Sequence, residues 1–389
     1  MAGKRLVLIG GGHAHLLTLA RIPQFVRAGI EVTVIQPSDF HYYSGMAAGM
    51  LGRFYRPDEI RFQTRATVEQ GGGIFVQGRV VHIDAAGQAL SLADGRRLDY
   101  DVLSCNAGSA VPEGFGAVPA VESKAAGAPL VVAVKPIENL VQAQERIEQL
   151  GRTRRLELVV AGGGPSALEL SGNLWRLGRV AEAMRPLHIT ICAGHGLLPR
   201  MPERVRRLAR ASLARRDIVV QENFSLQSVG QEGARAENGA CLAADIVIVA
   251  TGVRPSPIFA LSGLPCGPDG GLTVNRFLQS PAWPNIFGGG DCVYFQPQPL
   301  DKVGVYAVRQ NPVLADNLFA ACTGVPLRPF HPGGRYLLIY NLGDGSGIFH
   351  LGGLVFGGPL AFRLKDWIDR RFMQRFQLAA ASPSGCGGT

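Results

Sequence analysis

The stretch KRLVLIGGGHAHLLTLARI, residues 4–22, decides the fold class of this chain. Its first part is a short apolar run that ends at three consecutive glycines, and its second part has the apolar spacing of a helix. A branched apolar run, EVTVI, follows at residues 31–35. We therefore expect a strand, a glycine turn, a helix and a second strand, which together form a β-α-β unit that binds half of a dinucleotide.

The same pattern occurs a second time. The run LELVVA at 156–161 meets glycines 162–164, a helix-like stretch follows, and HITIC at 188–192 supplies the next strand. Two later apolar runs also end in glycine, DIVIVA at 245–250 and NIF at 285–287. The sequence therefore predicts an α/β protein with two Rossmann-like nucleotide-binding units.

Composition narrows the class of protein. The chain has 389 residues, 47% hydrophobic and 18% charged, with 51 Gly and 25 Pro, which excludes a small disulfide scaffold and makes a helix bundle an unfavoured choice. The net charge of +9 favours an anionic partner such as a cofactor phosphate or a membrane surface. Nucleic acid is not expected as a partner, because the arginines lack interleaved aromatic residues.

The seven cysteines stand singly, without C-x-x-C or a metal-type pairing with His, so we expect no dithiol redox centre and no metal site. The apolar run near the N-terminus is too short for a signal peptide, which favours the cytoplasm.

The first glycine turn is expected to bind a pyrophosphate, because glycines let backbone N–H groups and the helix end approach it. Gly10 and Gly12 fit this role, and His13 and Ala14 follow them. His15 departs from the fingerprint, which favours Gly or Ala there. The acid expected after the second strand is replaced by Gln36, whose amide would contact a ribose without a charge.

The second turn fits the phosphate pattern better. Glu169 lies near the start of its helix, where it faces the ligand or the neighbouring domain, or acts as a simple helix-dipole acid. The ribose acid is again absent, and an arginine that follows can neutralise a 2′-phosphate, so NADPH is at least as plausible as NADH. The residues expected to bind this nucleotide are Gly162, Gly164, Pro165, Ser166, Arg200, Thr251 and Gly252.

Chance rarely assembles all the motifs of this chain. They are two glycine turns about 150 residues apart, the pair Thr251-Gly252, and the late Gly-Gly-Gly-Asp at 288–291. The chain resembles the pyridine nucleotide-disulfide oxidoreductase superfamily over residues 4–330. Its nearest resemblance is to type II NADH dehydrogenases and to flavoproteins associated with selenide water dikinase. The stretches that carry it are GGGHAHL, HYYSGM, VKPIENL (134–140) and KVGVYAVRQNPVLADNL (302–318). It implies a three-layer ββα, glutathione-reductase-like fold, with FAD on the first unit and NADH or NADPH on the second.

The resemblance also assigns roles to residues. Asp291 matches the carboxylate that holds the flavin ribityl chain, with Gly108 and Gly290 in the same cofactor site. Glu169 matches a glutamate near the nicotinamide, and Ala307 and Gln310 align with a quinone-lining segment, which makes Glu169 and Gln310 the candidate catalytic residues. Lys135 is placed near the flavin by its position in VKPI, although a surface lysine is the simpler interpretation.

These matches predict an FAD-dependent NAD(P)H oxidoreductase that passes electrons to a quinone or a similar acceptor. One alternative is a flavin-containing accessory protein with a degenerate nucleotide site, linked to selenium metabolism. Another is a sulfide:quinone oxidoreductase-like enzyme that uses Cys105 and Cys292, although neither sequence context matches that family. The missing C-x-x-C excludes disulfide reductases.

Residues 362–377 predict a basic amphipathic helix at the C-terminus. Leu364, Trp367, Ile368, Phe372 and Phe376 share one face at helical spacing. This face would lie on an anionic membrane, at the inner face of the cell membrane, or pack on the protein's own core or a second subunit of a homodimer.

The expected domain boundaries follow from these patterns. They are 1–113 and 256–330 for the two parts of the FAD-binding domain, 114–255 for the NAD(P)H-binding domain, 331–378 for the C-terminal strands and helix, and 379–389 for a disordered tail.

Overall fold

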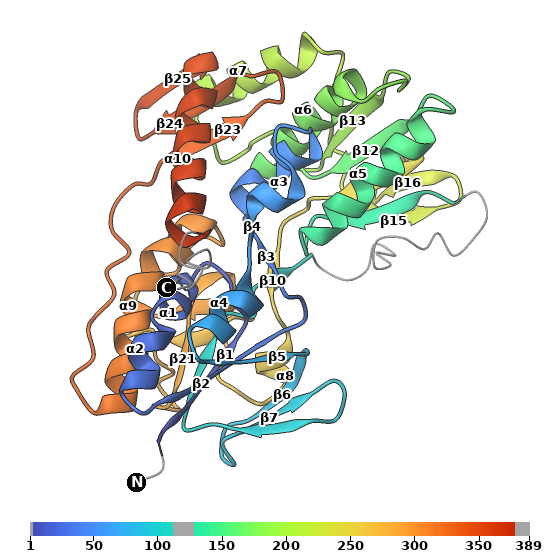
Figure 1. The fold of residues 1–389 in the computed structure, drawn as a ribbon. Helices are drawn as coiled ribbons and strands as arrows, with labels where there is room; N and C mark the ends of the chain where they lie inside the picture. The colour runs from blue at the N-terminus through green and yellow to red at the C-terminus, as the bar shows by residue number, and fades with distance from the viewer. Residues whose placement is uncertain (1–2, 112–127, 378–389) are drawn as a thin grey trace, which may run out of the picture.

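The computed structural model describes residues 3–111 and 128–377, and its largest elements are two parallel sheets of five strands each (Figure 1). The first sheet has the strand order β21-β9-β1-β2-β5. Its strands are β1 (Arg5–Ile9), β2 (Glu31–Gln36), β5 (Ile74–Gln77), β9 (Val102–Cys105) and β21 (Ile286–Gly288). Because β1 pairs in parallel with both β2 and β9, the first glycine turn leaves from the middle of this sheet.

The second sheet has the order β11-β18-β12-β13-β14. Its strands are β11 (Leu130–Ala133), β12 (Glu157–Ala161), β13 (His188–Ala193), β14 (Val219–Glu222) and β18 (Ile246–Val249). Here β12 is the inner strand, paired in parallel with β13 and β18, so the second glycine turn has the same position as the first. The predicted α/β class with two Rossmann-like units is confirmed.

Each face of the second sheet is covered by a different layer. Val159 and Ala161 of β12 pack with the antiparallel sheet β15-β16-β17, whereas Leu158 and Val160 pack with helices α5, α6 and α7. The bounds of these elements are β15 (Leu226–Gly230), β16 (Gly233–Ala236), β17 (Cys241–Leu242), α5 (Glu138–Gly151), α6 (Pro165–Val180) and α7 (Glu203–Ala214). Successive side chains of a strand point to opposite faces, so the continuous apolar run is buried on both sides.

The first sheet is covered in the same manner. Leu90 and Leu92 of the antiparallel sheet β6-β7-β8 share one apolar cluster with β1 and β2. The antiparallel strands are β6 (Val80–Asp84), β7 (Ala89–Leu92) and β8 (Arg97–Asp99), and the helices nearest the sheet include α9 (Gly304–Thr323). The three-layer ββα arrangement therefore occurs twice in the chain.

The helix after the first turn is shorter than the sequence predicts. The structure has α1 (Leu16–Ala20) and a separate α2 (Ile22–Arg27), with Pro23 in the first turn of α2. Proline has no N–H to continue the hydrogen bonds of the preceding helix, so a new helix begins here.

The C-terminal part adds a three-stranded antiparallel sheet and a long helix. These are β23 (Leu338–Asn341), β24 (Gly347–Leu351), β25 (Leu354–Gly358) and α10 (Pro359–Gln377). Figure 1 shows α10 running from the C-terminal hairpin toward α1. Within the described ranges, no helix is both long and apolar enough to cross a membrane.

The buried face of α10 differs from the predicted one. Lys365 and Asp369 face the protein together with Ala361 and Met373, whereas Trp367 is 58% exposed. The reason is that polar partners from residues 43–45 cover this side of the helix. Phe372 and Phe376 pack at its edge, as the interpretation of a core-packed helix expects.

The predicted boundary at 113 and the predicted disordered tail at 379–389 lie outside the described residues.

Candidate functional site

The first glycine turn is held by strand ends on both sides. The Gly10 N–H donates to Ile35 O (2.9 Å), and the Gly11 N–H donates to Gln36 Oε1 (2.8 Å). Gly10 has φ of +82°, and a Cβ there would lie 2.4 Å from the Asn106 carbonyl oxygen. Glycine is therefore required at this position for both conformation and space.

Gln36 has a structural task that the sequence did not predict. Besides accepting from Gly11, its Nε2 donates to Ser38 O (2.6 Å) and Phe40 O (2.8 Å). The side chain thus ties the turn to the loop after β2, and the predicted ribose contact stays a prediction.

His15 also acts within the protein. Its Nδ1 lies 2.6 Å from Gly10 O, and its Nε2 lies 2.8 Å from Ser104 Oγ. Burial lowers the pKa of this imidazole to about 4, while its hydrogen bond to Gly10 raises it. This explains why His15 can stand where the fingerprint has Gly or Ala, because both nitrogens of its neutral ring have hydrogen-bond partners inside the protein.

A charged cluster stands after β21. The Lys135 Nζ donates to Asp291 Oδ2 (2.7 Å) and to Ser109 Oγ (2.8 Å), and the Ser109 hydroxyl donates to the same carboxylate (2.9 Å). Burial acts to raise the pKa of Asp291, but the Lys135 ammonium and these hydrogen bonds hold it below its ordinary value. The surface position considered for Lys135 is wrong, because the structure places it against Asp291.

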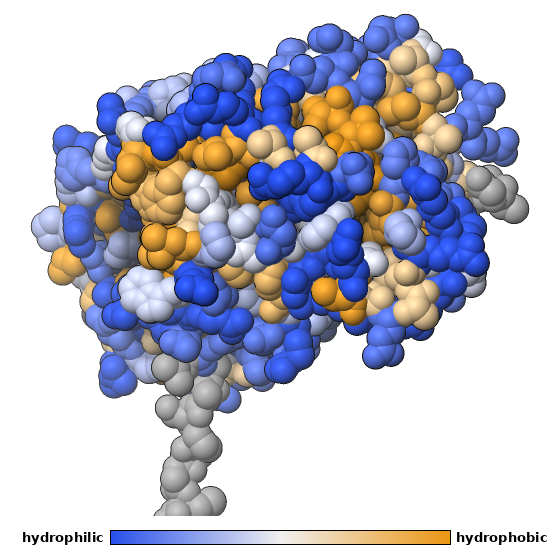
Figure 2. Space-filling view, turned by 90° about the horizontal axis from the view of Figure 1, so that it is seen from above, coloured by the Kyte–Doolittle hydropathy of each residue, from blue (hydrophilic) through white to orange (hydrophobic). Residues whose placement is uncertain are grey.

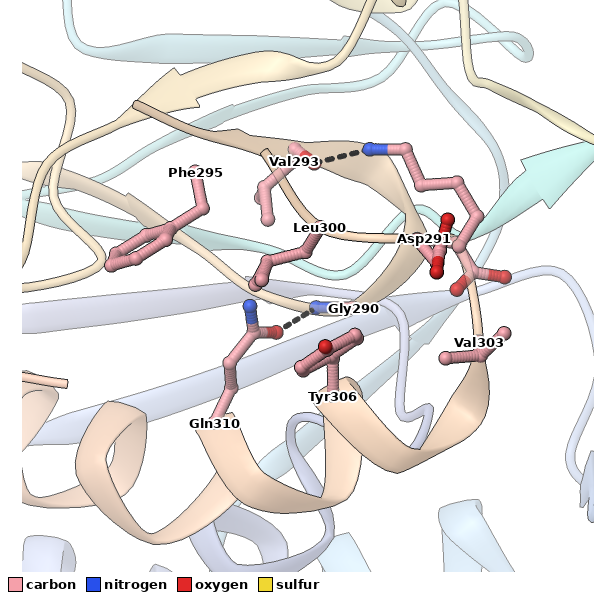
Figure 3. Close-up of a pocket in the computed structure, with 10 residues that line it drawn as sticks. Gly290, Asp291, Val293, Phe295, Leu300, Val303, Tyr306 and Gln310 are labelled. Atoms are coloured by element: carbon pink, nitrogen blue, oxygen red, sulfur yellow. Dashed lines mark hydrogen bonds between the residues drawn. The ribbon is translucent and has the colours of Figure 1, made fainter. Parts of the chain in front are cut away.

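Helix α9 supports the turn that carries Asp291. Gln310 is 1% exposed, and its Oε1 accepts the Gly290 N–H at 2.7 Å. Figure 3 shows Gln310 and Tyr306 side by side on α9, both pointing toward Gly290 and the pocket that these residues line. Ala307 is buried on the same helix. In the structure Gln310 thus fixes the backbone at Gly290, and its catalytic role stays a prediction.

Two further histidines lie beside the first turn. His41 Nε2 is 3.2 Å from His13 Nδ1. Burial lowers the pKa of His13 to about 4 and that of His41 well below its ordinary value. The position of His13 directly after Gly12 predicts that it belongs to the site. No pattern in the sequence predicts the same for His41, which begins the aromatic run HYYSGM.

The buried polar atoms around this turn fit a bound dinucleotide. His13 Nε2, Asn106 Nδ2 and Thr64 Oγ1 are buried and have no hydrogen-bond partner within residues 3–111 and 128–377. A Cβ at Gly12 would lie 2.8 Å from Asn106 Nδ2, and one at Gly290 would lie 2.7 Å from Asn106 Oδ1, so Asn106 stands between the two turns. Buried polar groups are normally paired, and the phosphates and hydroxyls of FAD supply suitable partners.

The second glycine turn is open at its helix end. The Gly162 N–H donates to Cys192 O (2.8 Å), and a Cβ at Gly162 would lie 2.3 Å from Ala250 O. In contrast, a Cβ at Gly164 would meet no atom within 4 Å. Pro165, Ser166, Thr251 and Gly252 are exposed around it. The N-terminus of α6 is therefore free to receive a phosphate.

The loop after β13 carries no carboxylate of its own. Glu222 at the end of β14 accepts the Leu197 N–H (3.1 Å) and a hydrogen bond from Arg210 (2.6 Å), which holds this loop. The side chain of Arg200 is 87% exposed and 4.0 Å from Asp301. Its predicted contact with a 2′-phosphate stays a prediction.

Glu169 faces the C-terminal sheet. Its Oε1 accepts the Asn341 N–H at 2.7 Å, which joins α6 to β23. Burial raises the pKa of Glu169, and the nearby Lys365 ammonium opposes this effect. This contact is with a neighbouring part of the chain, and the predicted place of Glu169 near the nicotinamide, with its catalytic role, stays a prediction.

A buried hydrogen-bond chain links α10 to the start of α3 (Ser44–Leu51) and to the residue before it. The Tyr43 hydroxyl donates to Asp369 Oδ1 (2.9 Å), and Lys365 Nζ donates to Asp369 Oδ2 (2.7 Å) and to Gly45 O (2.8 Å). Burial raises the pKa of Tyr43 well above its ordinary value, and Asp369 adds to this effect. The sequence did not reveal this group, because Tyr43 and Gly45 lie more than 300 residues from their partners on α10.

The cysteines near the flavin-site motifs are buried, free thiols. Cys105 and Cys292 are buried, and the Cys292 thiol donates to the backbone oxygens of Cys105 and Gly289 at 3.4 Å. Burial raises the pKa of both thiols, to about 12 for Cys292. Sulfide chemistry needs a reactive thiolate, which this environment disfavours.

Comparison with known proteins agrees with this geometry. Residues 4–313 match the family described as pyridine nucleotide-disulphide oxidoreductase. Ferroptosis suppressor protein 1 of Taeniopygia guttata is 24% identical over 362 residues, covering 91% of this chain and 90% of that protein. The internal alternative NAD(P)H-ubiquinone oxidoreductase A1 of Solanum tuberosum is 26% identical over 43% of this chain and 35% of its own length. The structure of NDH2 from Plasmodium falciparum in complex with NADH has a TM-score of 0.77 at 13% identity, covering 96% of this chain and 97% of that one.

Proposed function

The chain belongs to the pyridine nucleotide-disulphide oxidoreductase family, and from this premise we propose that it passes electrons from NADH or NADPH through FAD to a quinone-type acceptor. The observation that carries the proposal is the pair of glycine turns on two parallel sheets, one of them lined by unpartnered buried polar atoms. The names of similar proteins, among them an NAD(P)H-ubiquinone oxidoreductase, support the choice of donor and acceptor.

We assign FAD to the first turn. The backbone of Gly10 and Gly12 would face the pyrophosphate, with Asn106 beside it, and Asp291 would hold the ribityl chain through its hydroxyls. Lys135 keeps the Asp291 carboxylate charged and therefore able to accept hydrogen bonds. Bound FAD would accept a hydride from the nicotinamide and pass its electrons on, which is chemistry that no side chain supplies.

We assign the nicotinamide nucleotide to the second turn. The free N–H groups at the start of α6 would bind its pyrophosphate, and Glu169 would fix the position of α6 by its contact with β23. The choice between the two nucleotides depends on Arg200, whose exposed guanidinium is available for a 2′-phosphate.

A substitution at the open glycine tests this assignment. Gly164→Asp has room for its side chain, but it places a carboxylate where the phosphate would bind. We expect binding of the nicotinamide nucleotide to weaken at least about tenfold, which corresponds to 1.4 kcal/mol, while FAD stays bound. The matched control is Gly230→Asp, another site with open space around the new Cβ, on β15. Equal binding to both variants would contradict the assignment, and the absence of any nucleotide binding would favour the flavin-containing accessory protein.

We also propose that the protein binds a membrane surface peripherally at the end that carries the C-terminal hairpin. Leu354, Leu360 and Trp367 are more than half exposed there, and the Arg371 guanidinium lies over the Trp367 ring. Figure 2 looks onto this end and shows apolar patches bordered by hydrophilic residues. Exposed apolar side chains beside arginines are typical of surfaces that bind anionic lipid.

Sedimentation with lipid vesicles tests this surface. The protein should sediment with anionic vesicles but not with neutral ones, and Leu360→Ser combined with Trp367→Ala should release it. Leu261→Ser is the control, because Leu261 is 74% exposed on α8 (Ile258–Leu261). A protein that ignores vesicles but sediments as a dimer, and becomes monomeric in the double variant, would assign the patch to a homodimer instead.

A further inference from the structure

The two histidines beside the first glycine turn contact each other, and one ring nitrogen of His13 has no partner among the described residues. His13 Nδ1 and His41 Nε2 are 3.2 Å apart, close enough to share one hydrogen. His13 Nε2 is buried and has no partner among the described residues. A buried imidazole nitrogen normally has a hydrogen-bond partner, so this atom indicates a polar ligand beside it.

The chain places this pair between the phosphate turn and the Asp291 cluster. His13 follows Gly12 directly, and His41 begins β3 (His41–Tyr42). The charges of both Asp291 and Lys135 act on His13, and that of Lys135 acts on His41. The pair therefore lies near the Asp291–Lys135 cluster, where the proposed function puts the ribityl chain of FAD.

The groups around the pair leave it free to change its protonation. On its own element, His15 is fully bonded to Gly10 and Ser104. The Tyr43 ring lies 5.3 Å from that of His13, but its hydroxyl is bonded to Asp369. From α10 the apolar ring of Phe372 stacks over His13 at 6.1 Å.

The remaining charges act in opposite directions. Asp291 favours a protonated His13, whereas Lys135 disfavours it, and these two are bonded to each other. Burial then keeps the pair neutral at physiological pH. A new negative charge beside the pair would raise both pKa values and so favour the uptake of a proton.

We propose, resting on the proposed function, that the His13–His41 pair takes up one proton when the bound flavin is reduced and gives it to the acceptor when the electrons leave. Reduction of a quinone to its hydroquinone needs two electrons and two protons. The hydride taken from NAD(P)H carries two electrons and one proton, and leaves NAD(P)⁺. The pair supplies the second proton, so that both new O–H bonds form and both imidazoles return to the neutral state.

The number of protons taken up per two electrons tests this proposal. It is measured from the pH dependence of the flavin midpoint potential at neutral to mildly alkaline pH, with the flavin reduced photochemically. Each proton corresponds to about 30 mV per pH unit for a two-electron couple. We expect two protons in the protein as it stands and one in His13→Gln and in His41→Gln, since glutamine keeps a hydrogen bond but does not titrate in this range.

His82→Gln is the matched control, because His82 is an exposed histidine on β6, and it should leave the count at two. A count of one in the unchanged protein would overturn the proposal, even if a variant fails to bind FAD. A count that stays at two in both variants, with weaker FAD binding by His13→Gln, would also overturn it and leave His13 as a phosphate contact. Photochemical reduction needs no nucleotide, so failure of the NAD(P)H reaction would show separately.

Discussion

Asp291 remains charged inside the protein because Lys135 stands against it. The side chains are 16% and 26% exposed, so the pair is more than a surface contact but is still partly screened by water. The low pKa of Asp291 has a consequence for acid stability. The contribution of the carboxylate is present above its unfolded pKa, near 4, and is lost as the pH falls through its lower folded value.

Replacing Lys135 should weaken both this site and the fold. In Lys135→Met the Asp291 carboxylate loses its cation, so its pKa rises and FAD should be released at a higher pH than in the unchanged protein. We expect a loss of unfolding free energy on the order of 2 kcal/mol. Flavin fluorescence during acid titration and urea unfolding measure the two effects. The control is Lys4→Met, which removes an exposed lysine just before β1 whose Nζ donates to Ala321 O (3.0 Å). It should leave the pH of FAD release unchanged and lose less unfolding free energy than Lys135→Met.

Glu169 should show the opposite dependence on pH. Burial raises the pKa of its carboxyl, so the folded protein binds this proton more tightly than the unfolded chain does. The contribution is therefore present at low pH and is lost as the pH rises through the folded pKa. In Glu169→Gln the amide oxygen still accepts the Asn341 N–H, but the amide does not titrate and so loses no stability as the pH rises. The variant should therefore gain stability relative to the unchanged protein as the pH rises. Urea unfolding at acidic and neutral pH measures the difference, and an equal difference at both would contradict it.

At the scale of elements, sequence patterns predict the strands and their turns well and the packing of the C-terminal helix poorly. The runs that become β1, β12 and β18 end in glycine, and each local pattern is sufficient to place a strand and a turn. The packing of helix α10 is not predicted in this way, because Lys365 and Asp369 are charged residues that a local pattern assigns to the solvent-exposed face. Their partners, Tyr43 and Gly45, are more than 300 residues away, so no local spacing reveals that this side is buried.

The chain from Tyr43 through Asp369 to Lys365 should be what fastens α10 to the loop before α3. Tyr43→Phe removes the hydroxyl and leaves Asp369 with one bond fewer in a buried place. We expect a loss of about 1–3 kcal/mol in unfolding free energy and faster hydrogen exchange in α10. Tyr42→Phe is the control, since no hydrogen bond joins its hydroxyl to the described residues. Equal stability of the two variants would show that apolar packing alone holds the helix.

At the scale of the whole molecule, one β-α-β arrangement used twice brings two nucleotide turns into a single chain. The motifs themselves predict this duplication, whereas the roles of Gly10, Gly162 and Asp291 in binding the cofactors stay predictions. The contacts that complete the site, such as Asn106 between two turns and His41 against His13, come from segments that meet only in the folded chain. The division into domains stays a prediction, as does the choice between NADH and NADPH.

Anaerobic spectroscopy of the purified protein tests the proposed electron path most directly. The flavin absorbance is followed after addition of NADH or NADPH, and then after addition of a soluble quinone. We predict a yellow protein that at least one nucleotide bleaches rapidly and that the quinone recolours. A protein that carries flavin but is bleached by neither nucleotide, or is bleached and not recoloured by any quinone, would contradict the proposed transfer from NAD(P)H through FAD to a quinone.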